Sequence, residues 1–208
     1  MPPFLNMNNF ETQKKNFLSK PDKSSAKAID KKIFELVNLI NASKNYYTNS
    51  SCAGRILLIK TKNFDKKEKI WIFKKHEEVS WKEALKALKN AKSDIWLIEE
   101  GPILHVTCKN FRAANFLLKI FRNFGFKKSG IIAFSTYPIV ELAFPNRISL
   151  PIAKNGKLLL NKNYFKILID DCNKKLKKEF KFLKKIYNFL KTKNLNIIPL
   201  LSKKKNGI

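Results

Sequence analysis

Acidic side chains are scarce in this 208-residue chain, in which 16 aspartates and glutamates stand against 43 lysines and arginines and leave a net charge of +27 at pH 7. A charge of this size attracts phosphate-rich partners over a long range and gains from counterion release on binding. Arginine is also rare, and lysine, asparagine, isoleucine and phenylalanine share A- and T-rich codons, so genome composition can explain much of the lysine excess. It does not explain the low acidic count. We therefore expect a polyanionic partner, above all a nucleic acid.

Cysteine is too sparse and too irregular for a disulfide framework or a four-cysteine zinc site. Cys52, Cys108 and Cys172 are an odd number without a C-x-x-C spacing, which is typical of a reducing compartment. Zinc held by Cys52, His105 and Cys108 is an alternative, but three scattered ligands support it poorly, and we predict no metal. Met1 to Gln13 contains no signal-like apolar core, and no segment has the apolar length that a bilayer requires. We expect a cytoplasmic protein that does not insert into membranes.

The common nucleotide and metal motifs are missing as well. No G-x-G-x-x-G follows an expected strand, and no G-x-x-x-x-G-K-[ST] occurs, so the sequence supports neither a Rossmann dinucleotide site nor a P-loop. H-E-x-x-H and a clear carboxylate cluster are also lacking, which argues against a metal-dependent nuclease.

Hydrophobic periodicity predicts a mixed α/β (α+β) fold, with helices packed on a mixed sheet rather than a regular βαβ winding. A long amphipathic helix is expected near the C-terminus, from Phe165 to Leu190. We expect one domain over residues 1–208, with frayed ends at 1–8 and 192–208. The other expected helices cover 27–43, 81–91 and 111–124, and the expected strands cover 46–51, 55–60, 69–73, 94–98, 103–108, 130–135 and 139–144.

Local signals predict how these elements start, stop and connect. The polar run 22–25 offers N-cap side chains, and Ser80 with Glu83 forms a capping box. The charged run 65–69 is expected to be a turn, and Gly125 an αL C-cap of a helix that is apolar nearly all round. Two hairpins are predicted, one at the turn Glu100, Gly101, Pro102 and one at Asn155, Gly156.

One polar string stands out between two expected strands: Thr48, Asn49, Ser50, Ser51, Cys52, Ala53, Gly54, Arg55. Small hydroxyls, a glycine and an arginine together suit the capture of a carboxylate or another anion. The alternative is an ordinary serine-rich strand end with a glycine bulge.

His105 lies in the middle of an expected strand, where alternation places it with Ile103 and Thr107 on the face opposite Leu104 and Val106. One face can therefore be core and the other the wall of a pocket. A hydrogen-bonded structural histidine is the alternative, and the same choice applies to His76. Lys127, Lys128 and Ser129 join a helix end to a strand and could bind phosphate, or could be a plain turn.

Taken in order, these pieces resemble the tRNA wybutosine-synthesising methyltransferase family, in its third-step branch, over nearly the whole chain. The residues that carry the resemblance are Asp22, Ser24, Asp30, Tyr47, Thr48, Ser50, Ser51, Cys52, Gly54, Arg55, Ile56, Trp71, His76, Ile103, Leu104, His105, Val106, Cys108, Gly125, Phe126, Lys127, Ser129, Gly130, Ile131, Pro151, Leu159, Tyr164, Leu168 and Asn173. The chain departs from the family pattern at 25–28, where a lysine-glycine pair is common, and at Asn49 and Ala53.

The resemblance implies methyl transfer from S-adenosylmethionine to a ring nitrogen, N4, of the tricyclic 7-aminocarboxypropyl-demethylwyosine beside the anticodon of tRNA(Phe). We expect the anticodon stem-loop as partner and no obligate protein partner. The alternative is a non-catalytic, basic RNA-binding or chaperone protein.

Roles for individual residues follow as hypotheses. We expect the catalytic residues to be His105, Arg55 and Ser51, and the cofactor to be held by Ser50, Ser51, Cys52, Gly54, Arg55 and His105. Lys127, Lys128 and Ser129, with lysines of the last helix, are expected to contact RNA phosphates. Trp71 or Phe126 could stack on an extruded base, although such aromatics are more often core.

Overall fold

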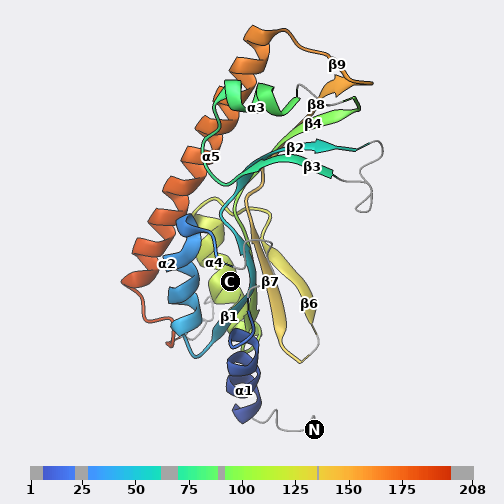
Figure 1. The fold of residues 1–208 in the computed structure, drawn as a ribbon. Coiled ribbons are helices and arrows are strands. Elements are labelled where there is room, and N and C mark those ends of the chain that lie inside the picture. Colours follow the sequence, from blue (N-terminus) through green and yellow to red (C-terminus); the bar gives the residue numbers. More distant parts are fainter. Residues whose placement is uncertain (1–6, 22–27, 62–69, 89–91, 135, 198–208) are drawn as a thin grey trace, which may run out of the picture.

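The computed structural model describes residues 7–21, 28–61, 70–88, 92–134 and 136–197. These ranges contain helices and strands in mixed order, as expected (Figure 1). The helices are α1 Met7–Leu18, α2 Lys31–Ala42, α3 Trp81–Leu88, α4 Phe111–Asn123 and α5 Lys162–Lys191. The strands are β1 Tyr46–Cys52, β2 Arg55–Lys60, β3 Ile70–Lys75, β4 Ile95–Glu100, β5 Ile103–Cys108, β6 Gly130–Phe134, β7 Pro138–Ala143, β8 Ile148–Lys154 and β9 Lys157–Leu158.

The strands form two antiparallel sheets, the first in the order β1-β5-β7-β6 and the second in the order β3-β2-β4-β8-β9. Three pairs of consecutive strands, β1–β2, β4–β5 and β7–β8, each contribute one strand to each sheet. Cys52 lies opposite Ile103 and Arg55 lies opposite Glu100, so the same register continues from one sheet to the other. The two sheets are therefore joined by three long strands that bend where they cross, at residues 53–54, 101–102 and 144–147, which we call the bend.

The predicted hairpin at Gly101 and Pro102 is wrong, because β4 and β5 continue in one direction and lie in different sheets. Glycine and proline interrupt the hydrogen-bonding ladder between strands. A bend within a strand requires such an interruption, just as a hairpin turn does. A Cβ on Gly101 would lie 2.8 Å from Glu179 Oε1 and 2.9 Å from Phe144 Cβ, so the bend is packed closely against its surroundings. The hairpin at Asn155 and Gly156 is confirmed, with positive φ at both residues as a type I′ turn requires.

The long C-terminal helix α5 is confirmed and runs along both sheets (Figure 1). Its N-terminal half packs Ile169 and Leu176 into the core of the second sheet, together with α3. Its C-terminal half packs Leu183 and Ile186 into the core of the first sheet, together with α2 and α4. Phe180 contacts both cores from the middle of the helix. One amphipathic stripe thus connects the two sheets on the face that the helices cover.

Two helices differ from their expected form. α2 begins at Lys31, and the expected cap residues 22–25 lie outside the described residues, as does the expected turn at 65–69. α4 is not apolar all round, because Arg112, Lys119 and Arg122 are exposed. Gly125 follows it with a φ of +98°, which confirms the αL C-cap. No helix in the described ranges combines the length and the apolar character needed to span a bilayer.

Candidate functional site

The polar string Thr48 to Arg55 covers the end of β1, the first crossing of the bend and the first residue of β2. The backbone there lies close to α5. Gly54 has a φ of +102°, and a Cβ on it would lie 2.9 Å from Leu176 Cδ1 and 3.0 Å from the Glu100 carbonyl oxygen. Only glycine fits both the conformation and the space. The bend therefore holds the string where the two sheets meet.

A row of three polar side chains crosses the first sheet from β1 to β7, and we call Ser50, His105 and Glu141 the polar row. Ser50 Oγ lies 3.0 Å from His105 Nδ1, and His105 Nε2 lies 2.9 Å from Glu141 Oε2. An ionised carboxylate only accepts hydrogen bonds, so Nε2–H donates to Glu141. In the neutral ring, Nδ1 then accepts from the Ser50 hydroxyl. The row is partly exposed, and Leu104 and Val106 on either side of His105 are fully buried, which confirms the predicted alternation.

A β-bulge at Asn49 places Ser50 in this row. The register shifts between Thr48, opposite Val106, and Ser50, opposite His105. The Asn49 side-chain oxygen stabilises the bulge, accepting hydrogen bonds from the Thr107 amide at 3.0 Å and the Thr107 hydroxyl at 2.7 Å. Ser51 lies opposite Leu104, a core residue, so it is on the other face of the sheet from Ser50. The structure thus brings Ser50, and not Ser51, to His105.

Glu141 was missed by the sequence reasoning. Its signal was one acidic residue within the apolar strand Ile139, Val140, Glu141, Leu142. In the sheet it lies directly opposite His105.

A second cluster, which we call the edge cluster, gathers Asp30, Cys52 and His76 beside the bend. His76 Nδ1 lies 3.2 Å from Asp30 Oδ2, 3.1 Å from the Gly54 carbonyl oxygen and 3.7 Å from Cys52 Sγ. Asp30 also accepts a hydrogen bond from the Ala53 amide at 2.9 Å. Residues before α2 and directly after β3 therefore hold the string in place from one side by hydrogen bonds to its backbone.

Charge stabilises this cluster. The hydrogen bond to Asp30, followed by the one to Cys52, raises the pKa of His76 to about 9, so its ring is protonated at neutral pH. Burial acts to raise the pKa of Asp30, but hydrogen bonds from His76 and the Ala53 amide outweigh it and leave this pKa below its ordinary value.

Among the described residues, Asp30, Cys52 and His76 are the group whose ligand atoms are close enough to hold a metal ion. Their geometry is already explained by hydrogen bonds, because a protonated Nδ1 donates to Asp30 and cannot ligate a metal at the same time. The alternative zinc set of Cys52, His105 and Cys108 is wrong. Cys108 is buried in the core on the face opposite His105, and the hydrogen-bond partner of its thiol is the Val106 carbonyl.

Arg55 is held in a fixed position across the bend. Its Nε donates to Glu100 Oε2 at 2.8 Å, and the other Glu100 oxygen lies 3.8 Å from Arg147. Its guanidinium carbon also lies 5.0 Å from the centroid of the Trp71 ring. Arg55 is thus a partly exposed, oriented cation beside the string.

The turn that contains Lys127, Lys128 and Ser129 divides by exposure. Both lysines are exposed, whereas Ser129 is buried, and its hydroxyl accepts a hydrogen bond from the Ala143 amide at 3.1 Å. Ser129 is therefore not available to an RNA phosphate in this structure. Gly130 pairs with Glu141, which places the turn beside the polar row. Phe126 is fully buried and cannot stack on a base, whereas Trp71 is 49% exposed.

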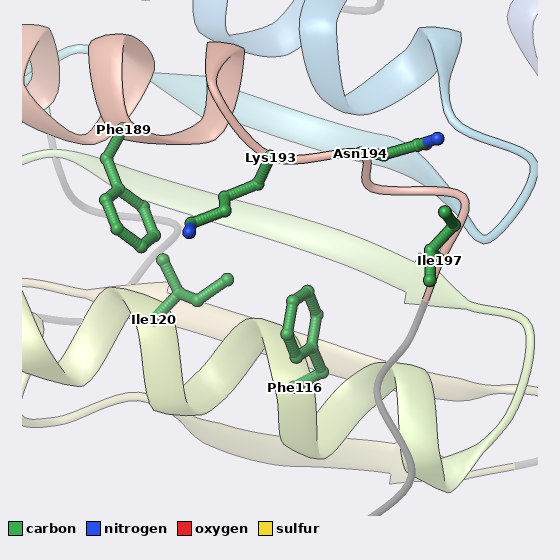
Figure 2. Close-up of a pocket in the computed structure, with 6 residues that line it drawn as sticks. All are labelled: Phe116, Ile120, Phe189, Lys193, Asn194 and Ile197. Carbon is green, nitrogen blue, oxygen red and sulfur yellow. The ribbon is translucent and has the colours of Figure 1, made fainter.

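A separate cavity of about 370 Å³ lies between α4 and the end of α5 (Figure 2). Its lining is mainly apolar and consists of Phe116, Ile120, Phe189, Lys193, Asn194 and Ile197. Phe189 lies thirteen residues beyond Leu176, which contacts the bend, so the two are roughly 20 Å apart along the helix. This cavity is not part of the site at the bend.

The bent sheets, the polar residues at their junction and the missing glycine-rich loop define an α/β protein outside the Rossmann class. A family model described as Methyltransferase TYW3 matches residues 12–192, and the chain belongs to this family of methyltransferases. Membership favours an enzyme over a non-catalytic RNA-binding protein.

Several archaeal proteins and solved structures are similar over most of the chain. A protein of Archaeoglobus fulgidus is 38% identical, and the alignment covers 72% of this chain and 76% of that protein. A protein of Thermococcus sibiricus is 34% identical, and the alignment covers 88% of this chain and 95% of that protein. Both are named tRNA(Phe) 7-((3-amino-3-carboxypropyl)-4-demethylwyosine(37)-N(4))-methyltransferase. The structure of the PH1069 protein from Pyrococcus horikoshii superimposes with a TM-score of 0.82 at 30% identity, covering 90% of this chain and 98% of that one.

Proposed function

We propose that this protein transfers a methyl group from S-adenosylmethionine to the N4 ring nitrogen of 7-(3-amino-3-carboxypropyl)-4-demethylwyosine at position 37 of tRNA(Phe). The observation that carries the proposal is the relative from Thermococcus sibiricus, which is named for this reaction and aligns with 88% of this chain and 95% of its own. The site at the bend supports it, because the family-like residues of the string gather there with two histidines.

The residues at the bend fit S-adenosylmethionine. Its amino-acid end carries a carboxylate and an ammonium group. Arg55 offers a guanidinium oriented by Glu100, and the end of β1 offers the hydroxyl of Ser50 on one face and that of Ser51 on the other. Cys52 and Gly54 would line the same site through the close backbone at the bend. When bound, the cofactor supplies an electrophilic methyl group on a sulfonium. The protein's contribution is then mainly positioning, which can lower a barrier by about 7 to 11 kcal/mol in favourable cases.

The polar row offers a route for the proton that N4 loses when it gains a methyl group. We assign Ser50 Oγ the role of accepting the proton that N4 loses, while the hydroxyl proton of Ser50 passes to His105 Nδ1. Glu141 stabilises the imidazolium that forms. This assignment moves the expected hydroxyl from Ser51 to Ser50, because Ser50 is the one next to His105.

Lys127 and Lys128 would hold phosphates of the anticodon stem-loop at the rim of this face. The helix α5, which carries the other lysines expected to contact RNA, lies on the side of the sheets that the helices cover (Figure 1). We therefore assign RNA contact to the turn before β6 first.

The direct test is mass spectrometry of the nucleoside at position 37 after the protein has been incubated with S-adenosylmethionine and precursor tRNA(Phe). The proposal expects one added methyl group, which is absent when the cofactor is omitted. The Thermococcus sibiricus relative, run in parallel, shows that the precursor is competent. Methylation by that relative and none by this protein would reject the proposed reaction.

A further inference from the structure

An exposed tryptophan lies beside the site on the second sheet. Trp71 is on β3, the edge strand next to β2, and 49% of it is exposed. It lies opposite Ile59, which in turn lies opposite Trp96 on β4, so the three form one row across the face away from α5. Ile59 is buried, whereas the Trp71 ring remains open beside it.

Two cations lie over this ring, and about half of the side chain remains exposed. Arg55 Cζ lies 5.0 Å and Lys74 Nζ lies 4.7 Å from its centroid. Cation–π contacts of this kind fix the orientation of the indole and bring positive charge next to an exposed aromatic surface. Proteins that bind single-stranded nucleic acid use this combination, because a base stacks on the ring while the cations meet the neighbouring phosphates.

Arg55 connects this surface to the candidate site, since it belongs to the polar string and contacts Trp71 at the same time. A base that stacks on Trp71 would therefore belong to a nucleotide close to the one in the site. We propose that Trp71 is the stacking platform for an unpaired anticodon-loop nucleotide adjacent to the methylated base, with Lys74 beside the intervening phosphate. The inference rests on the proposed function, because it takes the loop of a tRNA as the partner.

Trp81 provides a matched control. It also lies under two lysines, with Lys162 Nζ at 5.0 Å and Lys82 Nζ at 6.0 Å from its centroid. It begins α3 and packs against the core of the second sheet, which gives it a structural role. If any tryptophan near lysines bound RNA, the two positions would behave alike.

The experiment compares Trp71→Leu, Trp71→Phe and Trp81→Leu in binding an anticodon stem-loop of tRNA(Phe) and a fully paired duplex of the same length, by fluorescence anisotropy of the labelled RNA. Trp71→Leu should weaken stem-loop binding roughly tenfold to a hundredfold, because one stacked base is lost. Trp71→Phe, which keeps a ring, should recover most of the affinity. Duplex binding should not change, and Trp81→Leu should bind both RNAs as the wild type does.

Three results would overturn the platform: an unchanged stem-loop affinity in Trp71→Leu, an equal loss for the duplex, or an equal loss in Trp81→Leu. Calorimetric titration with S-adenosylmethionine adds a fourth, since a loss of cofactor affinity in Trp71→Leu would mean that the ring acts through Arg55. The outcome is independent of the methylation assay. If the wild-type protein binds the stem-loop through Trp71 but adds no methyl group, the proposed reaction is contradicted and the stacking role of Trp71 is supported.

Discussion

His105 has both ring nitrogens occupied, and each partner comes from a different strand. Ser50 reaches it from β1 because of the bulge at Asn49, and Glu141 reaches it from β7 because the two residues are directly opposite in the ladder. A histidine whose two nitrogens have different partners has a defined orientation and can pass a proton in one direction. At the residue scale, this geometry is the basis of the proposed proton route.

Replacing His105 with alanine should lower the methylation rate by roughly 10²- to 10⁴-fold, the range expected for a lost general base. Affinity for tRNA should stay within about twofold, because the imidazole is not assigned to phosphate contact. Single-turnover kinetics with precursor tRNA and a parallel binding titration measure the two quantities. Glu141→Gln should show a smaller loss that falls on kcat rather than KM, as a positioning residue predicts. Equal losses of rate and affinity in His105→Ala would contradict the assigned role.

His76 pairs with Asp30, whereas His105 pairs with Ser50 and Glu141, and the protonation state of His76 can be measured directly. The chain has two histidines, so NMR titration of their ring protons is simple to assign with His105→Ala. The wild-type His76 should titrate near pH 9, and Asp30→Asn should move its pKa down toward the ordinary value of 6.5, because the largest cause of the rise is removed.

The same shift has a consequence for stability. Because the pKa of His76 is raised on folding, its stabilising contribution is fully present below about pH 6.5 and is lost as the pH rises toward about 9. Asp30→Asn should lose this part of the pH dependence in urea unfolding. A wild-type His76 that titrates near 6.5 would show that the ion pair does not form in solution.

At the scale of elements, α5 contacts the bend through a triad of two buried carboxylates, Glu99 and Glu179, and the partly exposed Lys175. Glu99 is fully buried on β4, and its Oε2 lies 2.7 Å from Lys175 Nζ. Lys175 also pairs with Glu179 one turn further along the helix. The Glu179 carboxylate lies close to the Gly101 backbone, because a Cβ on Gly101 would be 2.8 Å from Glu179 Oε1. One lysine thus serves two buried carboxylates, and this leaves an excess of negative charge between helix and sheet.

This excess of negative charge predicts that the free energy of unfolding depends measurably on pH. Burial, followed by the charge of Glu179, raises the pKa of Glu99 to about 8 from an ordinary value of 4.5. The folded state then holds a proton that the unfolded state releases, so the Glu99 carboxyl makes the protein less stable as the pH rises from about 4.5 to about 8. In Glu99→Gln this penalty is absent, and the variant should gain stability relative to the wild type across that range.

Urea unfolding of both proteins between pH 5 and 8 would measure the difference in their free energies of unfolding, which should grow as the pH rises. Glu83→Gln is the control, because Glu83 pairs with Lys75 at an exposed site and should change stability little. A difference between Glu99→Gln and wild type that does not vary with pH would show that Glu99 carries no excess proton in the folded protein.

At the scale of the whole molecule, the helices and sheets form one connected structure, because α5 contributes to the cores of both sheets. We infer that the part of the chain that the structure describes folds as a single unit rather than as two domains divided at the bend. The net charge of +27 acts on the same scale, since it attracts a polyanion to the whole molecule over a long range.

Binding of tRNA should therefore weaken linearly on a plot of log affinity against log salt concentration. The double variant Lys127→Ala, Lys128→Ala should reduce the steepness of that line by about two, one for each lost phosphate contact. The double variant Lys184→Ala, Lys185→Ala on the exposed face of α5 is the control and should leave the slope close to that of the wild type. A flat salt dependence, or equal effects of the two double variants, would contradict the assignment of phosphate contacts to the turn before β6.

Much of the local structure and part of the site followed from the amino-acid sequence. The helix and strand segments, the Asn155–Gly156 hairpin and the face of His105 could be predicted because periodicity and turn chemistry act over a few residues. The string Thr48 to Arg55 could be singled out as well, because its polar residues interrupt an apolar stretch. The charge balance alone indicated a polyanionic partner.

The tertiary structure alone decided how these pieces meet. The sequence predicts a hairpin turn at Gly101 and Pro102, but the pairing of β4 and β5 with their neighbouring strands produces a bend there. The pairing of β5 with β7 also places Glu141 next to His105. Asp30 and His76 are far apart in the chain and form an ion pair only where α2 and β3 flank the string. Register and long-range contacts depend on the whole set of strands, so no local pattern specifies them.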